Sequence, residues 1–201
     1  MGIDIMCLTI DWESAVARYR ETGLEFYWDA VQARNRRYEA AGLPLPIPPE
    51  LEVLPGLPDA DDPDLWCGTR AFHLVADFYT DALRPALPAE LRRACEPVLP
   101  LFALCDEIPV PFDRQCLLTD SGLTKPPGND PSLYTLRPRT VHKVLEVARS
   151  VPWSELYEFD DEVVPFDGYD VHMLTSFALQ QLDRLEHAAQ RDQGVVLILS
   201  V

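Results

Sequence analysis

The carboxy-terminal stretch constrains the fold most strongly, because a long amphipathic segment runs directly into an unbroken apolar one. From Tyr169 onwards, apolar residues recur at three- and four-residue spacing, which places them on one face of a helix. Gly194 follows, and glycine readily adopts the left-handed backbone that ends a helix. Val195–Leu199 contains no polar residue, which is typical of a strand in the interior of a sheet. We therefore expect a helix packed on a sheet that holds the last strand inside it. The residues of the predicted helix face are Leu174, Phe177, Ala178, Leu182, Leu185 and Ala189.

A second strand is predicted at the other end of the chain. Both faces of Ile3–Ile10 are mostly apolar, and two such strands are most simply placed side by side. With 201 residues, of which 47% are hydrophobic and 25% charged, the chain is long enough to bury a sizeable core. The prediction is a single compact α+β domain over residues 1–201. Several helices would pack on a mixed sheet that contains both terminal strands.

Helices and proline-rich joints are predicted to alternate between these strands. Asp11 stands where a helix cap belongs, and Gly23 marks the end of that helix. Leu24–Ala41 is predicted as a second helix. Residues 43–64 contain seven prolines, which deny regular hydrogen bonding and favour an extended backbone. Apolar residues lie between these prolines, so we expect a proline-rich loop packed against the domain rather than a linker. Pro138 is predicted to open a later helix.

The cellular setting follows from the apolar runs and the cysteines. No apolar run approaches the roughly 20 residues that cross a bilayer, and the start lacks the features of a signal peptide. We therefore expect a cytoplasmic protein without membrane contact. The five cysteines show no Cys-x-x-Cys spacing, and an odd number in such a chain predicts reduced thiols buried as small hydrophobic residues.

The net charge of −16 is the strongest compositional signal. A polyanion repels the phosphates of nucleic acids, so we expect no nucleic-acid partner. A basic protein is the partner class that the charge favours, whereas the simpler interpretation is that acidity only keeps the protein in solution. The oligomeric state cannot be predicted from these features.

One constellation in the middle of the chain has the residue types of a catalytic or metal site. Leu65–Leu83 is predicted as a helix with five chemically suited side chains along one face: Trp66, Arg70, His73, Asp77 and Asp81. His73 and Asp77 are the candidate catalytic residues, because a carboxylate one turn away orients an imidazole. The alternative is a histidine at the margin of the core that bonds to its own helix. No metal site is predicted, because such a site needs three or four converging ligands and no zinc motif is present.

Two acidic segments are candidate binding surfaces. The first contains Asp59, Asp61, Asp62 and Asp64, and the second contains Asp160, Asp161 and Glu162. Neither has the ligand spacing or the central glycine of an EF-hand, so we expect them to contact a basic partner rather than to hold calcium.

Several stretches resemble the YfbM-like family of small bacterial proteins. The similarity involves the opening Met-Gly-Ile strand that leads through Asp11 into a helix and, more closely, the order of elements in the last third of the chain. That order runs from Leu133–Pro138 through the helix at Val141–Ala148 to Phe177–Leu197. The resemblance implies a compact α+β domain, and it implies no activity because the family has none assigned. The proline-rich loop departs from the family pattern.

Two function classes remain open. The first is a non-catalytic module that binds a basic protein, as an immunity protein, an inhibitor or a regulatory module does. The second is a small enzyme or ligand-binding protein with a pocket near His73 and Asp77. Because the chain lacks a nucleophile elbow, a dinucleotide fingerprint and a phosphate loop, we favour the first class and expect neither catalysis nor a cofactor.

Overall fold

The structure is a computed structural model of the whole chain. It describes residues 3–23, 65–70, 76–103, 105, 108–112, 132–159 and 170–200, and single positions between 25 and 42. Most of the predicted second helix and the whole proline-rich loop lie outside these residues.

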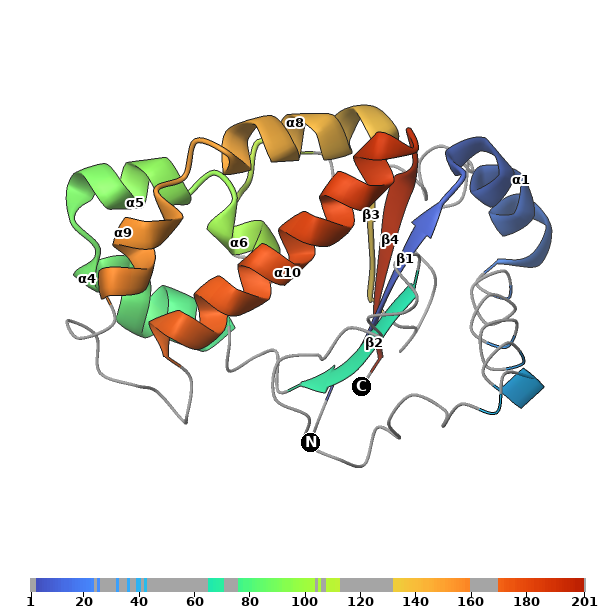
Figure 1. The fold of residues 1–201 in the computed structure, drawn as a ribbon, viewed down its shortest axis with the longest axis horizontal. Coiled ribbons are helices and arrows are strands. Elements are labelled where there is room, and N and C mark those ends of the chain that lie inside the picture. The colour runs from blue at the N-terminus through green and yellow to red at the C-terminus, as the bar shows by residue number, and fades with distance from the viewer. Residues whose placement is uncertain are drawn as a thin grey trace.

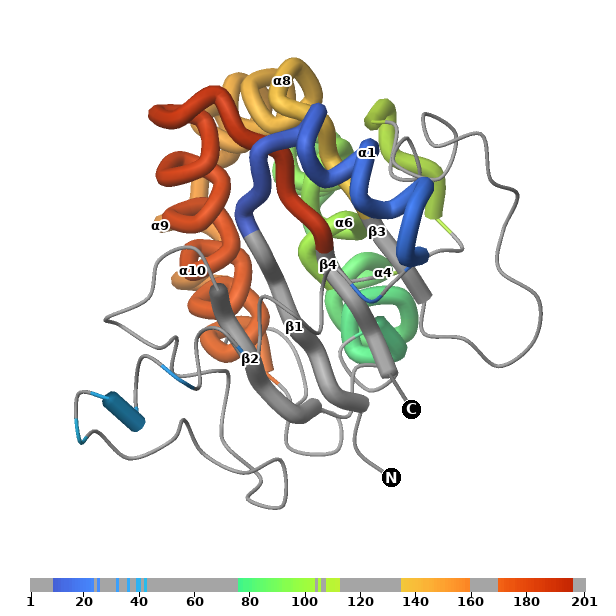
Figure 2. The backbone as a smooth tube through the Cα atoms, turned by 90° about the vertical axis from the view of Figure 1, so that its right-hand side faces the viewer, coloured from blue at the N-terminus to red at the C-terminus, as the bar shows by residue number. Residues whose placement is uncertain are grey.

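A four-stranded sheet in the order β2-β1-β4-β3 forms the centre of the fold (Figures 1 and 2). Its strands are β1 (Ile3–Ile10), β2 (Leu65–Arg70), β3 (Ser132–Leu136) and β4 (Gly194–Ser200). The two terminal strands pair directly, with Cys7 opposite Leu197. β4 therefore lies between β1 and β3, as its apolar sequence predicts, and Val195 and Val196 are buried. An α+β fold is confirmed.

The predicted mixed sheet is wrong, because all three pairings between the described strands are antiparallel. The path between β3 and β4 gives the physical reason. The end of β3 at Leu136 lies opposite Val195 at the start of β4, so the chain leaves one strand and enters the next at the same end of the sheet. A parallel pair would instead need a crossover to the opposite end.

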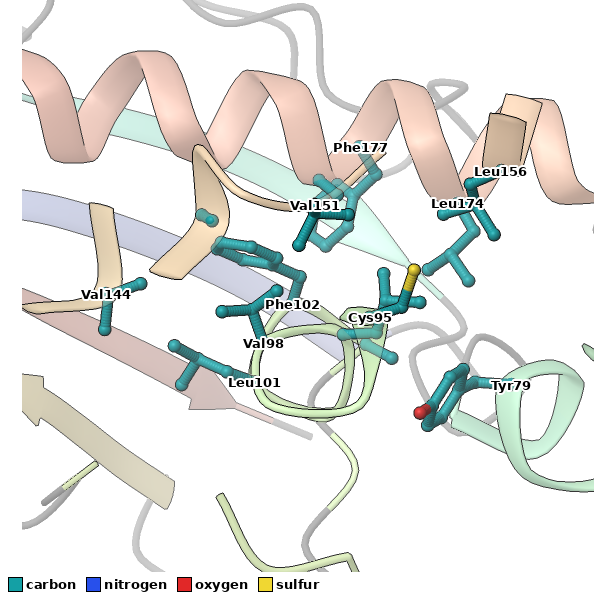
Figure 3. Packing of buried hydrophobic residues seen from close by; sticks show 14 of the residues in the cluster. Tyr79, Cys95, Val98, Leu101, Phe102, Val144, Val151, Leu156, Leu174 and Phe177 are labelled. Carbon is teal, nitrogen blue, oxygen red and sulfur yellow. The ribbon is translucent and has the colours of Figure 1, made fainter. Parts of the chain in front are cut away.

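Helices cover one face of the sheet, and α1 (Trp12–Thr22) lies on the other side (Figure 1). α8 (Pro138–Ala148) and α10 (Val171–Gln190) pack against each other and against strands. The shorter helices are α4 (Arg84–Ala86), α5 (Ala89–Cys95), α6 (Leu99–Phe102) and α9 (Trp153–Glu158). Apolar side chains from the long and the short helices form one cluster, which includes Val98, Phe102, Val144, Leu156, Leu174 and Phe177 (Figure 3). This cluster also contains Cys95 and Cys105, which are free and buried as predicted.

The predicted helix starts at Asp11 and Pro138 are confirmed, and the structure adds a cap at Asp170. Asp11 Oδ1 accepts the backbone N–H of Ser14 at 2.8 Å, and Gly23 ends α1 with φ 61°. Asp170 Oδ1 accepts the N–H of Met173 at 2.7 Å and caps α10 in the same way. Pro138 stands at the first turn of α8. The two aspartates satisfy backbone groups that the helices themselves leave unpaired.

The end of α10 differs from the prediction, because Asp192 rather than Gly194 takes the left-handed conformation. With φ 53° at Asp192, the N–H groups of Asp192 and Gln193 donate to Ala189 O and Ala188 O at 3.1 and 2.8 Å. This is the Schellman arrangement, and aspartate is one of the few residues with a side chain that tolerate it. Gly194 is instead required for a close approach: a Cβ there would collide with the Trp12 ring and lie 2.9 Å from Leu136 O.

The predicted helix over Leu65–Leu83 is wrong in its first part. Residues 65–70 form the edge strand β2, in which Trp66 pairs with Cys7 and Arg70 with Ile3. Helical structure begins in the described residues at 76 and includes a π-helix, η1 (Phe78–Leu83), which continues into α4. The physical reason lies in the neighbouring strand: β1 needs hydrogen-bonding partners along both of its edges. Trp and Thr favour a strand in β2, and Gly68 disfavours a helix there.

Candidate functional site

The structure separates the residues of the predicted catalytic face. Trp66 and Arg70 belong to β2, whereas Asp77 directly precedes η1 and Asp81 is exposed within it. A single helical face from Trp66 to Asp81 is therefore wrong. His73 lies outside the described residues, so its proximity to Asp77 stays a prediction. Asp77 itself is half-buried, its side chain does not cap the helix, and its carbonyl oxygen accepts a bond from Thr80 Oγ1 at 3.2 Å.

The predicted binding residues of both acidic segments lie outside the described residues. These are Asp59, Asp61, Asp62 and Asp64 in the first segment and Asp160, Asp161 and Glu162 in the second. The described structure begins again at Asp170, whose carboxylate caps α10. The second segment therefore connects α9 to α10 in the chain.

Two ionisable groups, the phenol of Tyr79 and the thiol of Cys95, are buried and uncharged. Tyr79 of η1 is fully buried, and its hydroxyl has no hydrogen-bond partner among the described residues. Burial, followed by the charge of Glu96, raises its pKa above the ordinary range. Burial likewise raises the pKa of the Cys95 thiol at the end of α5 to about 12, with a smaller contribution from Glu155. Figure 3 shows both side chains in the apolar cluster. At neutral pH the two groups are a phenol and a thiol, and a thiol held neutral is a poor nucleophile.

An ion pair joins α4 to the end of α5. Arg84 Nε donates to Glu96 Oε1 at 2.7 Å, and Arg84 Nη2 also contacts that oxygen. Both side chains are partly exposed, so the pair lies at the surface. Sequence analysis missed this pair because twelve positions separate its members and no local motif connects them.

A different set of side chains stands out on the surface of α9 and α10. The ring of Tyr157 stacks on the imidazole of His172 with centroids 3.8 Å apart and planes at 11°. Tyr157 is 45% exposed and Leu179 is 41% exposed, and no other large hydrophobic side chain in the described residues is as open to solvent. Sequence analysis missed this surface. The available signal was Leu179, which lies outside the spacing of the buried face of α10.

Exposed carboxylates lie on the same two helices. Glu155 and Glu158 are exposed on α9, and Asp183 is exposed on α10 one turn beyond Leu179. Within the part of the chain that the structure describes, none of the three forms an ion pair. Glu155 stands two positions before Tyr157 and so lies on another side of α9. We call the five residues Tyr157, Glu158, His172, Leu179 and Asp183 the α9–α10 face.

The described ranges contain neither a metal cluster nor a membrane span. No group of three or more His, Cys, Asp or Glu side chains in these ranges is arranged to hold a metal ion. Among the helices that the structure describes, none combines the length and the apolarity of a membrane span.

Comparison with known proteins gave no match: no family model, no curated protein and no solved structure is similar to this chain. Membership of the YfbM-like family therefore stays a prediction. Function has to be inferred from the residues themselves.

Proposed function

We propose that this protein is a non-catalytic acidic module that binds a basic protein. The observation that carries the proposal is the net charge of −16 on a chain of 201 residues. A charge of this size attracts cationic surfaces over distances beyond direct contact and raises the rate of association with them.

The described ionisable groups are compatible with this function. The two whose pKa values are raised by burial, Tyr79 and Cys95, are neutral at pH 7 and lie inside the core. Other carboxylates have structural roles: Asp11 and Asp170 cap helices, and Glu96 and Glu186 pair with arginines. The exposed carboxylates of the α9–α10 face remain available to a partner.

The test is capture of partners from the source cell at about 0.1 M and 1 M salt, where the screening length falls from about 10 Å to about 3 Å. We expect a basic protein that is retained at low salt and released at high salt. Changing Asp61, Asp62, Asp160 and Asp161 to Asn should abolish its retention.

A matched variant separates location from total charge. Glu13, Glu21, Asp81 and Glu90 are exposed on other elements, and neutralising these four carboxylates changes the net charge from −16 to −12, as the first variant does. This control should retain the partner. Equal loss in both variants would show only a response to net charge, and the absence of any basic protein would refute the proposal.

A small enzyme or ligand-binding protein is the second candidate, because a π-helix follows Asp77 directly and buries the Tyr79 hydroxyl, which has no partner in the described part of the chain. Short π-helical segments are frequent at functional sites, and a buried polar atom without a partner requires an explanation. Metal analysis of protein purified without chelator discriminates the two candidates. A stoichiometric metal that disappears in a His73→Ala, Asp77→Ala variant would favour the enzyme.

A further inference from the structure

Each of the helices α9 and α10 exposes one large apolar side chain on the α9–α10 face. The buried residues of α10 include Leu174, Phe177 and Ala178, while Leu179 is 41% exposed on another side of the helix. On α9, Leu156 is fully buried and its neighbour Tyr157 is 45% exposed. Isolated exposed hydrophobic residues are common, but here both lie on one pair of packed helices.

The stack with His172 restricts Tyr157. A ring separation of 3.8 Å at 11° places one face of the tyrosine against the imidazole, and nearly half of its surface remains open. A tyrosine that is ordered before binding loses little conformational entropy when a partner contacts it, which is why such rings are frequent anchors at interfaces.

The spacing of His172 and Leu179 along α10 matches a helical ligand. The Tyr157 ring stacks on His172, and Leu179 follows His172 by seven residues on α10. The two α10 residues therefore lie on nearly the same side of the helix and are separated by about 10 Å along its axis. Two apolar side chains at i and i+7 of a bound helix span the same distance, which is the usual spacing of helix recognition.

The charges of the face indicate which kind of helix it would accept. Glu158 follows Tyr157 directly on α9, and Asp183 lies one turn beyond Leu179 on α10; both are exposed and form no ion pair within the described residues. Arg149, at the end of α8, does not neutralise them because it pairs with Glu186 of α10 at 3.3 Å. The polar margin of the face is therefore negative and complements lysine or arginine.

We propose that the α9–α10 face binds a basic amphipathic helix of the partner protein. The apolar side chains of that helix would contact Tyr157 and Leu179, and its lysines or arginines would lie against Glu158 and Asp183. This inference rests on the proposed function, because it adds to the two acidic segments a described surface and the partner segment that this surface would bind.

The test uses three labelled synthetic peptides and fluorescence anisotropy. The first is a lysine/leucine amphipathic helix, the second a lysine/glycine peptide of equal charge, and the third a glutamine/leucine amphipathic helix without charge. We expect the first to bind most tightly, with an affinity that falls as salt rises. Tyr157→Ala and Leu179→Ser should each weaken its binding about tenfold, a loss typical of central interface residues. Tyr157→Phe keeps the stacked ring and should bind like the wild type.

The peptides separate failure of this inference from failure of the proposed function. If the first two peptides bind equally and both ignore Tyr157→Ala, the acidic module is supported and the helix-binding face is refuted. If only the uncharged helix binds, the basic partner is refuted. If no peptide binds, the helix-binding face is refuted and the cell capture experiment decides the proposed function. Leu179→Ser and Tyr157→Phe should melt like the wild type, because Leu179 is exposed and phenylalanine keeps the stacked ring. Tyr157→Ala removes the stack and should melt slightly lower, so its binding is measured well below its melting temperature, where misfolding is excluded as the cause.

Discussion

Replacement of Gly194 by alanine tests the packing between α1 and the sheet. The new Cβ would lie 2.9 Å from the backbone oxygen of Leu136 and would also overlap the Trp12 ring. Neither neighbour moves readily, because Leu136 is in a strand paired with β4 and Trp12 is only 7% exposed. Overpacking of this kind typically costs about 1–3 kcal/mol, which is offset by about 0.5–1 kcal/mol because alanine loses less chain entropy than glycine. We expect a net destabilisation of about 1–2 kcal/mol.

Urea unfolding at equilibrium measures this loss as a lower midpoint with an unchanged slope. In a Trp12→Leu background the ring overlap is absent, so Gly194→Ala should cost less than half as much, and the remainder reports the contact with Leu136 O. Gly23→Ala is the matched control. Gly23 has φ 61° and a Cβ added there would meet no atom within 4 Å, so its cost is backbone strain and should add independently to Trp12→Leu. A Gly194→Ala protein with an unchanged or higher midpoint would refute the close approach.

Three further predictions concern the sheet, the first cap and the core thiol. Val196→Asp in the interior strand β4 should abolish soluble expression, because Val196 is 0% exposed. An unpaired buried carboxylate costs several kcal/mol against a total stability of about 5–15 kcal/mol. A soluble variant with the melting temperature of the wild type would show that the position is peripheral. Hydrogen bonds from Ser14 lower the pKa of Asp11, so the cap stabilises the fold above pH 3.8, the ordinary pKa, and this stabilisation is lost as the pH falls further. Asp11→Ala should therefore lower the melting temperature at pH 7, and the melting temperatures of variant and wild type should converge in acid. A difference that stays constant with pH would contradict this. Burial raises the pKa of the Cys95 thiol from 9.0 to about 12, so the stability that the neutral thiol contributes is present below pH 9.0 and lost as the pH rises towards 12. In a Cys95→Ala variant the free energy of unfolding should therefore fall less steeply at alkaline pH. An unchanged fall would exclude this thiol as a cause.

Sequence reasoning predicted the elements whose patterns are long and whose ends carry chemical signals. α1 combines an apolar face with Asp11 and Gly23, and α10 has an apolar face that recurs over most of its length, although its cap at Asp170 was not predicted. β4 was predicted as an interior strand because an apolar run without interruption is stable only when both faces are covered. In each case the local preference and the tertiary environment agree.

The wrong predictions concern residues whose conformation depends on distant partners. Residues 65–70 have a helix-compatible spacing of polar groups, but their pairing with β1 makes them a strand. Gly194 has the residue type of a helix end, but the nearby Trp12 ring explains it better. The stack of Tyr157 on His172 joins two different helices, and no local pattern in the sequence reports such a contact.

Hydrogen exchange on the complex with the captured basic protein tests the central proposal most directly. At low salt we predict that the partner slows exchange in Trp153–Glu158 and in the first half of Val171–Gln190, while Trp12–Thr22 is unaffected. The protection should disappear at high salt and in the Tyr157→Ala variant. Protection confined to α1, or protection of α9 and α10 that persists at high salt, would contradict an acidic helix-binding face.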